Sequence, residues 1–269
     1  MSEAVTVRPV IAARHVTMTF TTRKGPLTVL EGFDLQVQPG EVVCIVGASG
    51  CGKSTFLNLV AGFLRPSGGE VLLEGRPISR VEPRCGMIFQ SYALFPWMTV
   101  LENVAFGPRL KGASRRACRE RARHWISMVG LDGFEHAYPE ELSGGMQQRV
   151  ALSRVLANDP EVLLCDEPFA ALDAMTRQVL QQELLQVVAD TGKTVLFITH
   201  SIDEALILSD RLVVMSARPG RVKAVYCNDL PRPRGMDVQI TDRFLELKRG
   251  IWGLVQEEVV GSLTVLQRR

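Results

Sequence analysis

The sequence has no long hydrophobic run. Although 46% of its 269 residues are hydrophobic, no stretch reaches the roughly 18 consecutive apolar residues that cross a bilayer as a helix. Residues 1–16 also lack the uninterrupted apolar segment behind a basic one that marks a secretory signal peptide. We therefore expect neither a membrane-spanning segment nor secretion, and we expect a cytosolic chain with an ordinary globular core.

Closely spaced cysteine pairs are missing too. The six cysteines are scattered and form no C-x-x-C motif: Cys44, Cys51, Cys85, Cys118, Cys165 and Cys227. This spacing argues against a zinc site and against a disulfide framework. We expect reduced thiols that pack mostly as small core residues.

An excess of one charge is also lacking. The formal net charge is only +2, so the chain has no broad basic field of the kind that nucleic-acid-binding proteins use. We therefore expect no DNA or RNA partner.

Two local basic features do occur. Residues 231–234 read Pro-Arg-Pro-Arg, which we interpret as a solvated linker. Five arginines fall within one predicted helix, and they are Arg115, Arg116, Arg119, Arg121 and Arg123. A solvated helix face is the interpretation we favour for them, with an anion site as the alternative.

The motif around which the chain is organised follows an apolar run of strand length at residues 42–46. It fits G-x-x-x-x-G-K-[ST] and consists of Gly47, Ala48, Ser49, Gly50, Cys51, Gly52, Lys53, Ser54 and Thr55. A glycine-rich turn between strand and helix directs backbone N–H groups toward one point and can bind polyphosphate. Lys53 should reach the β- and γ-phosphates of a nucleotide, and Ser54 should give its hydroxyl to Mg²⁺. The alternative is a glycine-rich turn without a ligand.

The apolar patterns predict an α/β fold. Unbroken apolar runs at residues 161–165 and 194–199 are typical of strands buried on both faces of a parallel sheet. Short antiparallel strands are predicted over residues 5–37, around a polar turn at 21–26, and further strands near 70–73, 77–81 and 212–215. A helical lobe is predicted over 91–157. Helices are predicted over 53–61, 173–190 and 241–257.

Two carboxylates, Asp166 and Glu167, end the strand predicted at 161–165. Ligands gather at the carboxyl ends of strands in open α/β sheets. Asp166 is suited to hold Mg²⁺, and Glu167 is suited to polarise or deprotonate the attacking water. A solvated turn is the alternative.

Two weaker candidates follow other predicted elements. His200 stands after the strand at 194–199 and could donate a hydrogen bond to a γ-phosphate, or be structural. The following Ser201 and Glu204 fit a capping box. Ser143, Gly144 and Gly145 begin a helix, with Ser143 at the N-cap. Because glycine is costly inside a helix, either something approaches this helix start closely or the helix is merely capped.

The order of these motifs resembles the nucleotide-binding subunit of ATP-binding cassette (ABC) transporters. The resemblance covers about residues 10–225 and rests on residues 47–54, Gln90, residues 142–146, Asp166 with Glu167, residues 171–173 and His200. It implies a P-loop NTPase fold of the ABC type, with a parallel-sheet core, an antiparallel β layer and an inserted helical subdomain. We expect the ATPase domain over 1–225, its helical subdomain at about 91–157, and a short C-terminal extension over 226–269.

The resemblance also implies roles that spacing alone does not. Gln90 would sense Mg²⁺ and the attacking water, and Asp173 would be the acid of the D-loop. Phe20 matches the aromatic position that stacks on adenine, with a core strand residue as the alternative. Ser143 to Gly145 would close over the γ-phosphate bound by another copy, so a homodimer is implied. Ala170 departs from the serine common in the family, which puts one D-loop hydrogen bond in doubt.

Other segments resemble parts of import systems. Residues 91–100 are rich in large apolar groups. In the family, this region forms the groove that receives a helix of the membrane permease. The alternative is that these side chains pack inside the helical lobe. Residues 215–222 resemble the branch that imports nitrate, sulfonates and taurine. The resemblance therefore implies permease subunits, an extracytoplasmic solute-binding protein, and a peripheral place on the cytoplasmic face of the membrane. Import of a pyrimidine or aromatic solute, a soluble ABC-type ATPase, and a nucleotide-binding scaffold without turnover remain as alternatives.

Overall fold

The computed structural model describes residues 8–267, and its chain divides into two compact units. The first unit holds residues 8–82 and 194–267, and the second holds residues 83–193. Val5 and Val7, the first members of the alternating pattern, lie outside the described residues. Among the described residues, no helix is long and apolar enough to cross a membrane.

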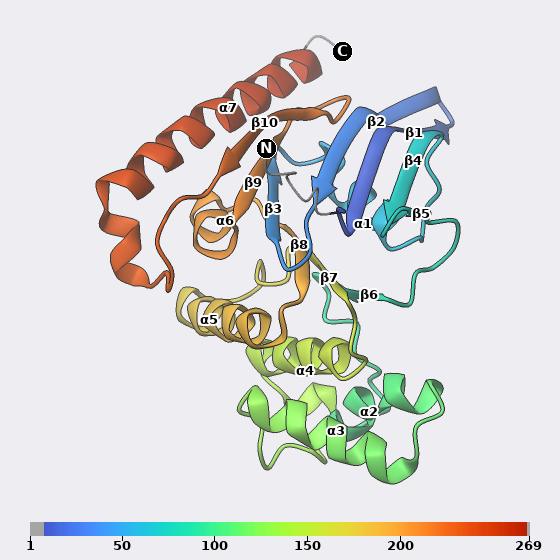
Figure 1. Cartoon of the computed structure of the whole chain (residues 1–269). Helices are drawn as coiled ribbons and strands as arrows, with labels where there is room; N and C mark the ends of the chain where they lie inside the picture. Colours follow the sequence, from blue (N-terminus) through green and yellow to red (C-terminus); the bar gives the residue numbers. More distant parts are fainter. Residues whose placement is uncertain (1–7, 268–269) are drawn as a thin grey trace, which may run out of the picture. The chain divides into compact units, whose positions relative to one another are not determined.

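The first unit contains two sheets (Figure 1). One is antiparallel, in the order β2-β1-β4-β5, and the other has the order β10-β9-β3-β8. Their strands are β1 (Ile11–Thr22), β2 (Gly25–Val37), β3 (Val42–Gly47), β4 (Gly68–Leu73), β5 (Arg76–Pro77), β8 (Thr194–Ile198), β9 (Arg211–Met215) and β10 (Val222–Cys227). The helices of this unit are α1 (Lys53–Val60), α6 (Ile202–Leu208), the 3₁₀ turn η2 (Met236–Ile240) and α7 (Asp242–Gln267).

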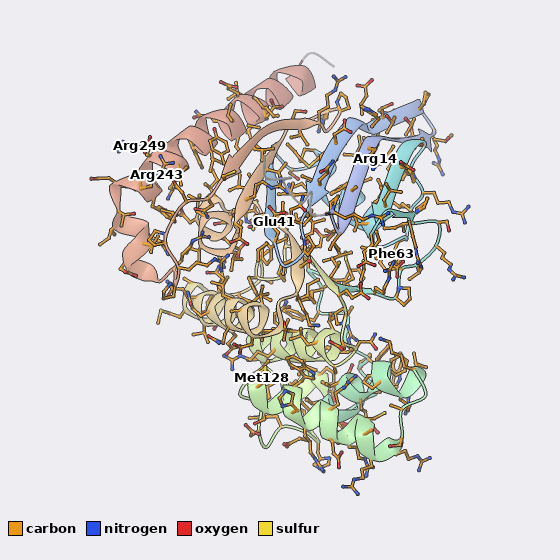
Figure 2. The ribbon with its side chains drawn as sticks, viewed as in Figure 1. Arg14, Glu41, Phe63, Met128, Arg243 and Arg249 are labelled. Atoms are coloured by element: carbon orange, nitrogen blue, oxygen red, sulfur yellow. The ribbon has the colours of Figure 1, made fainter. Side chains whose placement is uncertain are left out.

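The core of the first unit surrounds β3. Every residue of β3 is buried, and it pairs in parallel with β8 on one side and β9 on the other. Glu41, labelled in Figure 2, precedes β3 and accepts a hydrogen bond from Arg211 at the start of β9 (3.0 Å). Phe33 of β2 packs on Phe56 of α1 with ring centroids 4.5 Å apart. The apolar run before the glycine-rich motif is therefore a central strand, as its composition predicts.

The second unit joins two parallel strands to helices. Its elements are β6 (Cys85–Ile88), α2 (Val100–Leu110), α3 (Arg115–Met128), η1 (Pro139–Glu141), α4 (Gly144–Leu156), β7 (Val162–Asp166) and α5 (Ala174–Thr191). The parallel pair runs in register from Cys85 opposite Val162 to Ile88 opposite Cys165. The arginine-rich helix is α3, whose five arginines are all exposed, so this stretch forms a solvated face as predicted. Met128 in Figure 2 marks the end of α3.

The fold class predicted from the sequence is confirmed, because a parallel core, an antiparallel layer and helices are all present. The strand predicted at 77–81 is wrong, since β5 ends at Pro77. Residues beyond it cross the end of α1 instead, where the Glu82 amide donates to the Ala61 carbonyl (3.0 Å) and Arg80 lies against Gly62. The sequence prediction also missed β10 and ended the last helix ten residues early, at 257.

The interpretation of residues 231–234 as a solvated linker is wrong for Arg234. This side chain is only 3% exposed. Its guanidinium donates to the carbonyls of five residues: Leu206, Ile207, Ser209, Asn228 and Leu230. Burial, with the nearby charge of Arg232, lowers the pKa of Arg234 to about 10. The cation stabilises the C-terminal end of α6, whose last carbonyls lack partners within the helix.

We expect Arg234→Ala to destabilise the protein by about 3 kcal/mol, because it leaves several buried carbonyls without a donor. Arg232→Ala is the matched control, since Arg232 is 41% exposed and pairs with Asp210 at 2.7 Å. That exposed pair should contribute about 0–1 kcal/mol. Urea unfolding of both variants measures the difference. Equal losses would contradict a structural role for the buried guanidinium.

Candidate functional site

The glycine-rich motif forms the loop between β3 and α1. Gly50 and Gly52 have φ angles of 75° and 101°, which non-glycine residues adopt only with strain. Gly52 is the N-cap of α1. Among the described residues, no side chain caps this helix start, and its first turn holds no acidic residue. The start of a helix carries a partial positive charge, which is the property that the predicted phosphate site at α1 requires.

The loop packs closely against its surroundings. A Cβ on Gly52 would lie 2.7 Å from Leu30 Cδ2, and one on Gly47 would lie 2.9 Å from the Met215 carbonyl oxygen. A side chain at Gly47 would collide with the backbone of β9, and one at Gly52 would displace the Leu30 side chain and strain the backbone at φ 101°. Glycine at these two positions is therefore required by packing within the protein as well as by backbone geometry.

Lys53 is buried within this loop, with only 6% of its surface exposed. Its ammonium donates to the carbonyls of Gly47 (2.9 Å) and Ala48 (3.2 Å). These neutral acceptors interact with a cation less strongly than phosphate oxygens do. An anionic ligand entering the loop could therefore replace them with a gain in electrostatic energy.

Cys51 lies next to Lys53 and is 1% exposed. Its Sγ is 3.9 Å from Lys53 Nζ. Burial raises the pKa of the Cys51 thiol, and the opposing charge of Lys53 does not cancel this effect. Cys51 therefore stays a neutral thiol at physiological pH and serves as packing, as expected of the cysteines.

His200 follows β8, the strand beside β3, and is exposed. The Thr199 amide donates to the Ile45 carbonyl (3.2 Å), so the two chains stay paired up to this point. Ser201 caps α6 by accepting from the Glu204 amide (3.3 Å). The first unit thus brings the glycine-rich loop and His200 to the carboxyl ends of neighbouring parallel strands.

Phe20 lies on β1, opposite Leu27 of β2. It is half-buried and does not belong to the buried core. An aromatic face that keeps some exposure can receive another ring, so the adenine role stays a prediction.

The second unit brings Gln90, Asp166 and Glu167 to one edge of its strand pair. Asp166 ends β7, and Gln90 follows Ile88, the last residue of the neighbouring β6. Glu167 has φ 46°, the left-handed conformation that is rare outside glycine. Its carbonyl accepts from the Ala170 amide (3.2 Å), which closes the turn after β7. Strain of this kind concentrates at functional sites, and the sequence carries no sign of it.

Ser143 caps α4, as predicted, by accepting from the Met146 amide (3.3 Å). The glycines that follow are approached from within the second unit. A Cβ on Gly145 would lie 2.6 Å from Thr176 Cγ2, and one on Gly144 would lie 3.0 Å from the Tyr92 hydroxyl. Close approach therefore does account for glycine here, and these partners belong to the same chain.

Asp173 is the N-cap of α5. Its Oδ1 accepts from the amides of Met175 (3.1 Å) and Thr176 (3.0 Å). The hydrogen bond from the Thr176 backbone is the main cause that lowers the pKa of the Asp173 carboxyl. Asp173 thus has a structural role in its own chain, which sequence reasoning missed even though an aspartate directly before a helical run is a common cap signal.

The side chains predicted to hold Mg²⁺ offer a hydroxyl, an amide and a carboxylate oxygen: Ser54, Gln90 and Asp166. Oxygen ligands of this kind fit a hard divalent cation. Ser54 belongs to the first unit, and the other two belong to the second. Within the described residues, no group of three His, Cys, Asp or Glu side chains forms a metal site.

Comparison with known proteins shows which family this chain resembles. The family model described as ABC transporter matches residues 30–170. An ABC transporter ATP-binding protein of Methanocaldococcus jannaschii, described as uncharacterized, is 48% identical over 94% of this chain and 94% of its own. The taurine import ATP-binding protein of Jannaschia sp. is 44% identical over 93% of this chain and 97% of its own.

Two further relatives extend the comparison. The aliphatic sulfonates import ATP-binding protein of Bacillus cereus is 43% identical over 90% of this chain and 94% of its own. Among solved structures, a dimeric post-hydrolysis state of an ATP-binding cassette bound to ADP and Pi is similar, with a TM-score of 0.73 and 33% identity. That match covers 84% of this chain and all of the other.

The left-handed backbone at Glu167 leads to a stability prediction. Glu167→Gly should be more stable than Glu167→Ala by about 0.5–1 kcal/mol in the free energy of unfolding, because glycine adopts this conformation without steric cost. Urea unfolding of the two variants measures this difference. Both variants lose the carboxylate, so the comparison isolates the backbone. A glycine variant no more stable than the alanine variant would show that Glu167 is not strained.

Proposed function

The chain belongs to the ABC transporter family of ATP-binding proteins, and on that premise we propose that it powers an importer of a small anionic solute. Taurine, an alkanesulfonate or nitrate is the solute class we infer. The observation that carries this proposal is similarity over nearly the whole chain to proteins named as taurine and aliphatic sulfonate import subunits. ATP hydrolysis itself follows from membership of the family.

In the proposed reaction, the glycine-rich loop of residues 47–55, called the P-loop from here on, binds the phosphates of ATP. Lys53 exchanges its two loop carbonyls for oxygens of the β- and γ-phosphates, and the uncapped N-terminus of α1 adds backbone donors. Ser54, Asp166 and Gln90 would hold Mg²⁺, which neutralises charge on the phosphates when bound. Phe20 would stack on the adenine ring.

Hydrolysis then depends on the position of one water molecule. Glu167 would accept a proton as the water oxygen bonds to the γ-phosphorus and the bond to the β,γ-bridging oxygen breaks, leaving ADP and phosphate. His200 would donate a hydrogen bond to a γ-phosphate oxygen. The left-handed backbone at Glu167 supports this role, because strained conformations of this kind concentrate at functional sites.

A second copy would complete each site. Ser143, Gly144 and Gly145 at the start of α4 would close over the γ-phosphate held by the partner, with Asp173 of the D-loop beside them. Ser143 is exposed at this helix start. The similar solved structure is dimeric, which supports the homodimer.

Coupling to transport would require a permease on the membrane. Residues 91–100 offer a contact surface, because Trp97 is 69% exposed. Phe95 is packed within the second unit, 4.7 Å from Phe106 and with the Arg154 guanidinium 5.4 Å from its ring centre. Trp97 would therefore contact a permease helix, while Phe95 would hold the segment of residues 91–100 in place within the second unit. A solute-binding protein outside the membrane would deliver the solute, and the ATPase would sit on the cytoplasmic face.

The uptake of radiolabelled taurine, an alkanesulfonate and nitrate tests this proposal in cells that lack the gene for this chain. Restoring the parent chain should restore uptake of at least one of these anions. Lys53→Ala should lower that uptake by about tenfold or more, because the phosphates lose a charge-assisted partner.

The outcomes separate the alternatives. Restored uptake of a pyrimidine or aromatic solute alone would contradict the proposed solute class while leaving an importer. Purification without any polytopic permease, together with unchanged uptake of every solute, would favour a soluble ATPase instead.

A further inference from the structure

The turn formed by residues 216–221 joins β9 to β10 and packs against the P-loop. A Cβ on Gly220 would lie 2.0 Å from the Cys51 carbonyl oxygen, so the backbones are in direct contact. The Gly220 amide donates to the Val29 carbonyl (2.8 Å), and its carbonyl accepts from the Glu31 amide (3.2 Å). Gly220 is thus fixed to β2 while it supports the P-loop beside Gly52.

Hydrogen bonds within the turn make it stiff. Ser216 Oγ accepts from the Arg221 amide (3.0 Å) and donates to the Pro219 carbonyl (3.1 Å). The Ser216 amide donates to the Arg221 carbonyl (3.0 Å). The Arg221 guanidinium pairs with Glu31. A displacement of one end of this turn is therefore passed on to Gly220.

Helix α7 holds the other end of the turn. Figure 1 shows α7 running alongside β10. Glu258 of α7 accepts from the Ala217 amide through Oε2 (2.8 Å) and from Lys223 Nζ through Oε1 (2.7 Å). The Glu258 side chain is 19% exposed, whereas the neighbouring Glu257 is 68% exposed and pairs with Lys223 (2.8 Å).

The charge of Glu258 is retained despite its burial. Desolvation raises the pKa of this carboxyl, but hydrogen bonds from Lys223 and the Ala217 amide outweigh it, and the net pKa is lowered. The negative charge of Glu258 also acts on the P-loop. Burial is the main cause that raises the pKa of the Cys51 thiol, the charge of Lys53 opposes this rise, and the charge of Glu258 adds to it. Glu258 is thus electrostatically as well as mechanically connected to the loop.

We propose that Glu258 is a positioning residue for the P-loop, which holds the turn at residues 216–221 against Cys51 and thereby sets the affinity for ATP. This inference rests on the proposed function, in which the P-loop binds the phosphates. Without Glu258 the turn loses its contact at Ala217, only three residues before Gly220. The P-loop then has more conformations to give up when ATP binds, which weakens binding.

Three variants of α7 test this proposal. Glu258→Ala removes both hydrogen bonds. Glu258→Gln keeps an acceptor for the Ala217 amide and rescues most of the effect. Glu257→Ala is the matched control, because Glu257 shares Lys223 but does not reach the turn.

Calorimetric titration with MgATP should give a dissociation constant about three- to tenfold higher for Glu258→Ala than for the parent. Glu257→Ala should match the parent. In steady-state assays KM for ATP should rise while kcat stays within about twofold, because Glu258 contacts no reacting group. If Glu258 had a merely structural role, Glu258→Ala would lower the unfolding midpoint without raising KM relative to kcat.

A variant outside α7 tests the contact between Gly220 and the Cys51 carbonyl directly. Gly220→Ala places a Cβ against the Cys51 carbonyl and should weaken MgATP binding by more than about tenfold, with cooperative unfolding retained. Equal affinities in Glu258→Ala and Glu257→Ala, or parent-like affinity in Gly220→Ala, would overturn the proposal. Failure of the parent itself to bind MgATP would instead contradict the proposed function.

Discussion

The structure depends on one close approach, the packing of a glycine-rich loop on the segments around it. Gly52 lies against Leu30, Gly47 against Met215, and the Cys51 carbonyl against Gly220. These contacts fix the loop before any ligand arrives, so its N–H groups need little reorganisation to bind an anion. The buried Lys53 ammonium is held in the same place by two carbonyls. Preorganisation of this kind is what a phosphate-binding site requires, and the neighbouring segments supply it.

Much of this arrangement could be predicted from the sequence, because its signals are local. The apolar run before Gly47 predicts a buried strand, the G-x-x-x-x-G-K-[ST] pattern predicts a phosphate loop, and Ser143 predicts a helix cap. The carboxyl ends of β3 and β8, and those of β6 and β7, bring their candidate residues together as parallel strands must. Strand and cap signals depend on a few neighbouring residues, so a single sequence contains them.

Other features could not be predicted, because distant residues decide them. Arg234 follows two prolines in a polar stretch typical of a linker, yet the end of α6 offers carbonyls that bury it. Gly145 is explained by Thr176, which comes from another helix. The left-handed conformation of Glu167 leaves no trace in its residue type. The role of Glu258 arises only when α7 packs beside a turn some 40 residues earlier.

The central claim is that each ATP site is completed by the start of α4 from a second copy. The mass of Glu167→Gln in solution, measured by multi-angle light scattering, tests it most directly. Because this variant should bind ATP without hydrolysing it, the account predicts a dimer with MgATP and a monomer with MgADP. Adding Ser143→Arg, which places a bulky cation at the helix start, should restore the monomer in MgATP. A Glu167→Gln chain that stays monomeric with saturating MgATP would contradict the account.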